Sequence, residues 1–190
     1  MTVIRRLDAT EVRAALSELA ALLYDAVDAG DSISFLADFT DADAHAFYDG
    51  LMPEIDRGTR VVLAAYDGED LVASVQLVHA WPPNSQYRAE VVKLVVHRRA
   101  RGRGIGRALM ERLETEARAD GKTLLVLDAV ADGVAAGLYE RLGWTRDTIR
   151  AALDHWFRVR GQMRPDGRNR RKGLEVKNRG GSRGRAEPPT

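Results

Sequence analysis

The sequence predicts an α/β fold with a mixed sheet, in which antiparallel strands come first and a parallel strand–helix–strand unit follows. Three observations lead to this fold class. Two helix-like segments with apolar residues at helical spacing open the chain. Two β-like runs joined by a short turn come next. An apolar strand then passes through a glycine-rich turn into a long helix and a second apolar strand, which is the pattern of a right-handed parallel unit.

The first helix is predicted over residues 10–29, where leucines recur at helical spacing and Gly30 follows as a natural stop. A second helix is predicted to begin at Thr40. Asp43 lies three residues further on, which is a variant of the capping box, and Gly58 would end this helix.

The antiparallel strands are predicted over residues 60–66 and 71–80, with a hairpin turn at residues 67–70. Residues 81–85 contain two prolines and are expected to form a loop. Residues 90–97 (EVVKLVVH) form a largely apolar run, which is typical of a strand that is buried on both faces.

The parallel unit follows. A helix is predicted over residues 105–120, with Leu109, Leu113 and Ala117 facing inward. A buried strand over residues 123–127 is closed by Asp128, and a short helix over residues 133–142 comes last.

The composition is that of a globular protein and excludes several kinds of site. The chain has 190 residues, of which 45% are hydrophobic and 30% are charged, so it is too apolar for a wholly disordered chain. The absence of cysteine excludes disulfides, zinc-thiolate sites and a cysteine nucleophile. The four histidines are scattered, and we expect no metal site. Without a membrane-length apolar run or a signal-peptide core, a cytoplasmic location is expected.

The charge is divided unequally along the chain. Residues 1–145 hold 16 Lys+Arg and 23 Asp+Glu, a net charge of −7, whereas residues 146–190 hold 13 and 5, a net charge of +8. We therefore expect a domain over residues 1–150 and a divergent basic tail over 151–190, partly disordered. The tail can be a solvated extension or a weak nucleic-acid or polyanion contact, and no aromatic interleaving supports the second reading.

The glycine-rich turn carries the clearest functional signal. Residues 101–109 read RGRGIGRAL, and three glycines in five positions let a ligand approach the backbone. The helix that follows begins with unpaired N–H groups and a partial positive charge, so the turn suits a pyrophosphate. Arg101, Arg103 and Arg107 would add positive charge. The alternative is a tight turn with a solvated arginine cluster.

Other phosphate-binding motifs fit less well. The P-loop pattern Gly-x-x-x-x-Gly-Lys-Ser/Thr is absent from the chain. A dinucleotide-binding fold needs Gly-x-Gly-x-x-Gly and an acid after the next strand. Asp128 could be that acid, but a motif that starts at Gly102 needs glycine where the chain has Arg107.

The turn resembles the coenzyme A signature of the GNAT superfamily of N-acetyltransferases. That signature is Gln/Arg-x-x-Gly-x-Gly/Ala, and Arg101, Gly104 and Gly106 match it. Within the superfamily the chain most resembles the tabtoxin-resistance type, and the resemblance covers roughly residues 10–146. The stretches that carry it, besides the turn, are Leu94-x-Val96, Leu138-Tyr139, Gly143-Trp144, and residues 35–38, 88–91, 93–94 and 127–128.

The resemblance implies that acetyl-CoA is the cosubstrate and a primary amine of a small molecule the acceptor, with direct transfer in a ternary complex. The pantetheine arm would pair with the main chain of the strand before the turn, and a backbone N–H there would polarise the thioester carbonyl. The residues implied in cofactor binding are Leu94, Val95, Val96, Arg101, Gly102, Arg103, Gly104, Ile105, Gly106 and Arg107.

The resemblance also implies three catalytic side chains. Glu90 would be the base, Asp128 a second carboxylate that orients or helps to deprotonate the amine, and Tyr139 the acid that protonates the leaving thiolate. Each has a structural alternative: a solvated strand-edge acid, a cap, and a core aromatic residue. His79 and His97 are expected to be ordinary strand-end residues.

Two further questions stay open. The family normally has two strands after Trp144; residues 145–149 can form the first, and residues 157–160 or 174–177 a weak second. A divergent or frameshifted end, with the last strand missing or poor, is one hypothesis for the basic tail. The rival to an enzyme is a non-catalytic acyl-CoA-binding or regulatory module, and the protein can be a monomer or a homodimer.

Overall fold

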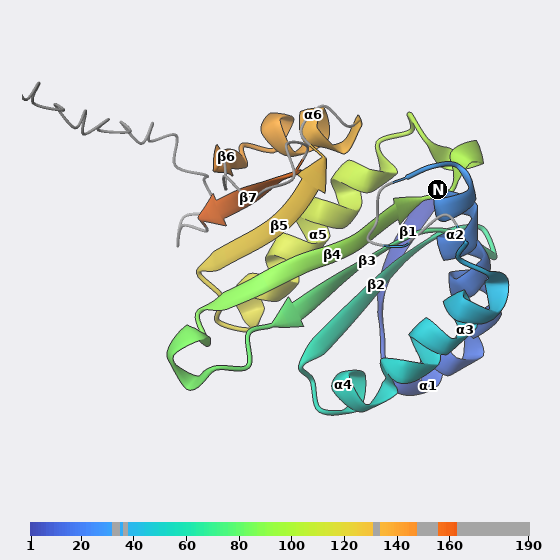
Figure 1. The fold of residues 1–190 in the computed structure, drawn as a ribbon, viewed down its shortest axis with the longest axis horizontal. Helices are drawn as coiled ribbons and strands as arrows, with labels where there is room; N and C mark the ends of the chain where they lie inside the picture. Colours follow the sequence, from blue (N-terminus) through green and yellow to red (C-terminus); the bar gives the residue numbers. More distant parts are fainter. Residues whose placement is uncertain (32–34, 36–37, 131–133, 148–155, 163–190) are drawn as a thin grey trace, which may run out of the picture.

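The computed structural model describes residues 1–31, 35, 38–130, 134–147 and 156–162. Its centre is one seven-stranded sheet in the order β1-β2-β3-β4-β5-β7-β6 (Figure 1). Only β4 and β5 pair in parallel, and every other neighbouring pair is antiparallel. The α/β fold class with its mixed sheet is therefore confirmed. The strands are β1 (Thr2–Leu7), β2 (Arg60–Asp67), β3 (Asp70–His79), β4 (Arg88–Val96), β5 (Leu124–Val130), β6 (Thr145–Asp147) and β7 (Trp156–Gln162).

The first strand has no counterpart among the elements expected from the sequence. β1 pairs antiparallel with β2, from Thr2↔Asp67 to Leu7↔Val62. Its side chains explain why it is hard to recognise: Leu7 alone is buried, and Val3, Arg5 and Arg6 are exposed, so the apolar alternation of a half-buried strand is weak.

The N-terminal helices are shorter than the sequence predicts. The segment 10–29 divides at Ala15 into α1 (Ala9–Ala14) and α2 (Leu16–Asp28). The next helix also divides, into α3 (Asp41–Gly50) and α4 (Met52–Asp56). Its predicted start is confirmed, because Thr40 is the N-cap and its backbone N–H donates to Asp43 Oδ2 at 2.8 Å in a capping box.

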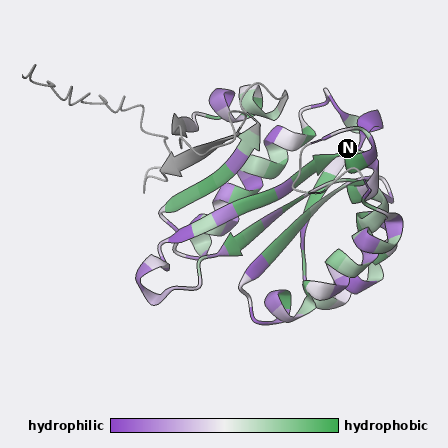
Figure 2. Cartoon of the chain, viewed as in Figure 1, coloured by the Kyte–Doolittle hydropathy of each residue, from purple (hydrophilic) through white to green (hydrophobic). Residues whose placement is uncertain are grey.

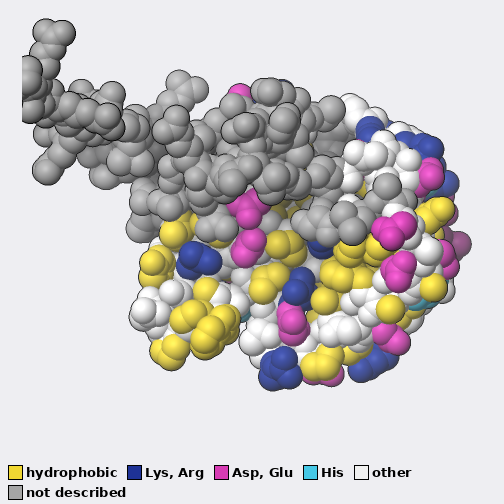
Figure 3. Space-filling view, in the orientation of Figure 1, with side chains coloured by type: hydrophobic (Ala, Val, Ile, Leu, Met, Phe, Trp, Pro, Cys, Tyr) yellow, Lys and Arg dark blue, Asp and Glu magenta, His cyan; other side chains and the backbone are white. Residues whose placement is uncertain are grey.

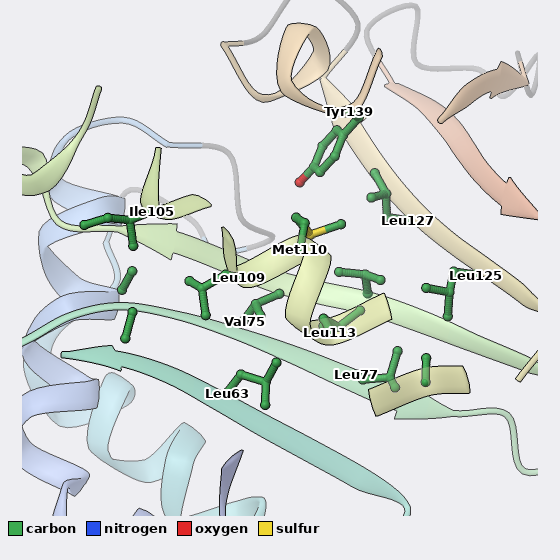
Figure 4. Close-up of a cluster of buried hydrophobic side chains, with 14 of the residues drawn as sticks. Leu63, Val75, Leu77, Ile105, Leu109, Met110, Leu113, Leu125, Leu127 and Tyr139 are labelled. Atoms are coloured by element: carbon green, nitrogen blue, oxygen red, sulfur yellow. The ribbon is translucent and has the colours of Figure 1, made fainter. Parts of the chain in front are cut away.

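Two apolar clusters cover opposite faces of the sheet. The first contains Leu109 and Leu113 of α5 (Ile105–Ala119) packed against β2 to β5, as Figure 4 shows. The second joins α1 to α4 with inward side chains of β2 and with Val95 of β4. The strands at the centre of the sheet are accordingly mostly hydrophobic in Figure 2. Burial of these two clusters is the main force that holds the layers together.

The C-terminal part of the described chain completes the sheet. After the short helix α6 (Val134–Arg141), β6 follows and β7 pairs antiparallel with β5 from Leu124↔Gln162 to Val130↔Trp156. Of the two candidates for the last strand, residues 157–160 therefore lie in β7, and residues 174–177 fall outside the described residues. The last strand is not missing, and the sheet continues beyond residue 150, the expected end of the domain.

Candidate functional site

The glycine-rich turn has the backbone geometry that an anion site needs. Gly102 and Gly104 have φ of +76° and +79°, in the left-handed region that favours glycine. Gly104 is the N-cap of α5 and offers no side chain to the first N–H groups of that helix. The first turn of α5 also contains no acidic residue. Its N–H groups and partial positive charge are thus available to a phosphate.

The three arginines of the turn form exposed ion pairs. Arg101 contacts Asp31, Arg103 contacts Asp67 at 2.8 Å, and Arg107 contacts Glu111 at 2.8 Å. The nearby Arg103 guanidinium lowers the pKa of Asp67, first through a hydrogen bond and then through its charge.

Exposed pairs of this kind contribute little to stability, so a diphosphate can compete for the arginines. Arg101 has a second role, because its Nε donates to the carbonyl of Val96 at 3.0 Å and ties the turn to the end of β4.

β4 carries a bulge and separates from β5 beside this turn. Ser74 and Gln76 of β3, two residues apart, pair with Val95 and Val92 of β4, three residues apart, so β4 contains one extra residue. Lys93, within the bulge, has a left-handed φ of 54°.

The pairing of β4 with β5 ends at Glu90↔Val126 among the described residues, although β4 continues to Val96 and β5 to Val130. An edge of β4 next to the turn is therefore not paired with β5. Leu94, Val95 and Val96 all lie on this part of the strand.

The structure brings Glu90 and Asp128 to one face of the sheet. Ala89 and Val91 pack in the cluster with α5, so Glu90 between them faces the other side. Leu127 and Ala129 belong to the same cluster, and Asp128 therefore also faces away from α5. Glu90 is half-buried and Asp128 is exposed.

Asp128 does not close its strand, as the sequence suggested, but lies within β5 opposite Arg158 of β7. Figure 3 shows acidic side chains next to basic ones over β4 and β5 on this face.

Tyr139 lies on the opposite side of the sheet. Its side chain is 7% exposed in the cluster around α5, and Figure 4 shows the hydroxyl directed inward towards Met110. Burial raises the pKa of Tyr139 to about 12, so the phenol keeps its proton at neutral pH. Glu90 and Asp128 therefore lie on one face of the sheet and Tyr139 on the other, and the place where β4 and β5 separate lies between them.

The remaining residues considered in the sequence have structural partners or lie apart. His79 Nε2 is 3.3 Å from Asp120 Oδ2, and His97 Nδ1 accepts a hydrogen bond from the backbone N–H of Arg99, so both are strand-end residues as expected. Trp81 is 86% exposed in the loop between β3 and β4. The described residues contain no group of three or more acidic or histidine side chains that could hold a metal, and none of their helices has the length and hydropathy of a membrane span.

Comparison with known proteins assigns the family. A model of the acetyltransferase (GNAT) family matches residues 22–144, which include the bulged strand, the turn and Tyr139. The chain belongs to the GNAT family of acetyltransferases. This match covers more than half of the chain and agrees with the coenzyme A signature at Arg101, Gly104 and Gly106.

Solved structures of N-acetyltransferases share the fold at low sequence identity. The ribosomal-protein-alanine N-acetyltransferase of Brucella melitensis is 22% identical, with a TM-score of 0.68 over 85% of this chain and 99% of the other. An N-acetyltransferase of Staphylococcus aureus is 18% identical, with a TM-score of 0.67 over 85% and 98% of the two chains. The PaiA N-acetyltransferase of Thermoplasma acidophilum, solved in complex with coenzyme A, is 18% identical, with a TM-score of 0.66 over 85% and 99%.

One residue of this site was not singled out from the sequence. Lys93 lies in the bulge of β4, and its ammonium nitrogen is 4.1 Å from the ring centroid of Phe35 and 5.6 Å from that of Phe47. The available signal was a single lysine inside the otherwise apolar run VVKLVV, because a lysine is seldom found within a buried strand.

Proposed function

We propose that this GNAT protein transfers the acetyl group of acetyl-CoA to the primary amine of a small molecule, in a direct ternary complex. The observation that carries the proposal is the separation of β4 from β5 after Glu90↔Val126, next to the uncapped N-terminus of α5. A diphosphate bound at that N-terminus would leave an attached arm beside the unpaired edge of β4. The relative solved with coenzyme A supports the choice of donor.

The backbone would hold the donor at two places. The pyrophosphate would be bound by the backbone amides of the turn. These amides belong to Arg101, Gly102, Arg103, Gly104, Ile105, Gly106 and Arg107. The main chain of Leu94, Val95 and Val96 would pair with the pantetheine arm as an added strand does. One N–H of this strand would then donate to the thioester oxygen as negative charge develops there.

The carboxylates would prepare the amine. A free alkylamine with a pKa near 10.4 is only about 0.04% neutral at pH 7, so a base is useful. Glu90 would accept the proton, directly or through a water, and Asp128 on the same face would orient the ammonium group before it is deprotonated. The new C–N bond forms as the C–S bond breaks.

Tyr139 would supply the proton for the leaving sulfur. Its phenol lies on the face of the sheet opposite the two acids, so the amine and the thiolate can be served from different sides. Burial keeps the phenol protonated until the thiolate forms beside it. Solvent would then restore the proton.

The test is release of coenzyme A across a panel of small amines. We expect turnover by the natural sequence and loss of most of it in the double variant Glu90→Gln, Tyr139→Phe, with acetyl-CoA affinity retained in a calorimetric titration. Glu69→Gln, on the exposed β2–β3 hairpin, is the matched control. Binding of acetyl-CoA without turnover on any amine would favour the rival, a non-catalytic acyl-CoA-binding or regulatory module.

Several finer features are part of the same proposal. Closeness to the tabtoxin-resistance type, a cytoplasmic location, and a monomeric or homodimeric state follow from the resemblance and the composition. A second acceptor class, an amine of a protein, is suggested by the name of the Brucella melitensis relative, a ribosomal-protein-alanine N-acetyltransferase. A peptide in the same assay tests it.

A further inference from the structure

Arg88, the first residue of β4, is a half-buried arginine with no pairing partner among the described residues. Its Nε is buried and forms no hydrogen bond. Its two terminal nitrogens also have no described partner, but they are not buried, so a ligand can reach them. Burying a donor without an acceptor costs free energy, because the contact with water is lost and nothing replaces it. A residue that costs the fold in this way is expected at a functional site.

Arg88 and Glu90 lie on the same face of the sheet. Ala89 between them packs in the cluster around α5, so its two neighbours point to the opposite face, which also carries Asp128. We call this face of β4 and β5 the acceptor face. The Cα atoms of Arg88 and Glu90 are about 7 Å apart, because the two residues are two positions apart in an extended strand. No ion pair joins the two side chains among the described contacts, so both remain available to a third group.

The loop before Arg88 is held in place by hydrogen bonds. Gln86 Nε2 donates to the carbonyls of Ala80 and Pro82 at 3.0 and 3.2 Å, and the carbonyl of Gln86 accepts from Lys122 Nζ at 2.8 Å. The backbone N–H of Ala80 donates to the carbonyl of Arg88 at 3.2 Å. Figure 1 shows this loop at the end of β4 that lies away from the glycine-rich turn. The backbone that carries the Arg88 side chain therefore has a defined position.

The proposed function gives the acceptor a direction along β4. The donor would occupy the edge of β4 at residues 94–96, on the side of Glu90 that faces the turn. The amine would lie next to Glu90, so the rest of the acceptor has to extend away from the donor. Along β4 that direction leads from Glu90 to Arg88.

We propose that Arg88 binds a carboxylate of the acceptor while Glu90 receives its amine, so that the enzyme acetylates amino acids in preference to simple amines. The inference rests on the proposed function and adds a substrate class to it. A guanidinium offers two parallel N–H donors that match the two oxygens of a carboxylate. Because Arg88 is half-buried, water would screen this pair less than it screens a pair at an exposed arginine.

The experiment compares acceptors that differ only in the carboxylate. Each common α-amino acid is paired with its carboxamide, and each short ω-amino acid with the alkylamine of equal length. Coenzyme A release gives kcat/KM for both members of every pair. The amine pKa differs within a pair, so the measured quantity is the change of the acid-to-neutral ratio between variants. In Arg88→Met we expect this ratio to fall at least about tenfold for the best pair, mainly through KM. Arg88→Lys, which keeps the charge but loses the paired donors, should lose less.

The controls separate this inference from the proposed function. Arg57→Met removes an exposed cation at the end of α4 and should leave the ratio unchanged. A thermal melt checks that Arg88→Met folds, and Arg88→Gln replaces it if it does not. Calorimetry of the acids with the coenzyme A-bound protein measures acceptor binding without turnover. If coenzyme A does not bind, the proposed function fails, and this inference fails with it.

Two results would refute the role of Arg88 while the enzyme stands. One is an acid-to-neutral ratio that stays unchanged in Arg88→Met. The other is an equal loss for acids and neutral acceptors, because Arg88 would then support Glu90 without binding the carboxylate. A fall of the ratio together with weaker calorimetric binding of the acid alone would support the proposal.

Discussion

The glycine-rich turn and the proposed acceptor face of β4 and β5 differ in how the chain builds them. The turn is made by a short continuous segment, and its proposed function depends on the left-handed backbone at Gly102 and Gly104. The acceptor face is made by side chains from β4, β5 and the connection before α3, where Phe35 lies. A site made of backbone tolerates many side-chain changes but few changes of conformation. The acceptor face is made of side chains, so it should tolerate few changes of side chain.

The largest expected effect comes from Glu90. In Glu90→Gln we expect kcat to fall about 100-fold, because a positioned base contributes on the order of 10²–10⁴ to the rate. The affinity for acetyl-CoA should change less than twofold, since the donor would be held by the backbone. Steady-state kinetics and calorimetry measure the two quantities. A matching loss of acetyl-CoA affinity would show that the two regions are not independent.

A substitution at Gly104 tests the turn, and it should change the affinity for acetyl-CoA rather than kcat. In Gly104→Ala the side chain meets a left-handed backbone at φ of +79°, which costs about 1–2 kcal/mol or shifts the turn. We expect acetyl-CoA affinity to fall about tenfold by calorimetry, with kcat at saturating acetyl-CoA nearly unchanged.

Gly106→Ala is the control for that change. A Cβ at Gly106 would lie at an ordinary contact distance of 3.5 Å from Leu138 and Val96, so the affinity should stay within about threefold. Equal losses in the two variants would argue against the role of the left-handed conformation.

The protein should become less stable at alkaline pH because the phenol of Tyr139 is buried. Burial raises the pKa of Tyr139 to about 12, while the unfolded phenol has a pKa near 10. Above pH 10 the unfolded state releases this proton first, so the free energy of unfolding should fall between pH 10 and 12, by about 1 kcal/mol from Tyr139 at pH 11. Urea titrations at pH 9 and pH 11 measure it, and Tyr139→Phe should show a smaller decrease than the natural sequence. An unchanged slope would contradict the burial of the hydroxyl.

The acceptor face should respond to pH with the opposite sign. Because the pKa of Lys93 is about 8 in the folded state and near 10.4 in the unfolded state, the folded protein loses this proton first. The Lys93 contribution to the free energy of unfolding therefore rises between pH 8 and pH 10. Lys93→Met should flatten this rise in urea titrations, and Arg57→Met should not.

Local signals in the sequence predicted several parts of the structure closely. The capping box at Thr40 and Asp43 was recognised because both partners lie within one helical turn. β1 was missed because its exposed arginines hide the alternation, and its place is fixed only by pairing with β2, far along the chain. The resemblance gave Glu90, Asp128 and Tyr139 as expectations, but the distribution of these side chains over the two faces follows from strand register.

The sequence by itself determined the turn at residues 101–107, because left-handed backbone favours glycine and a helix N-terminus attracts anions. The tertiary structure alone decided the bulge in β4, its separation from β5 after Glu90, and the contact of Lys93 with Phe35 and Phe47. These features depend on register between strands and on packing between distant segments, and neither leaves a local pattern in the order of residues.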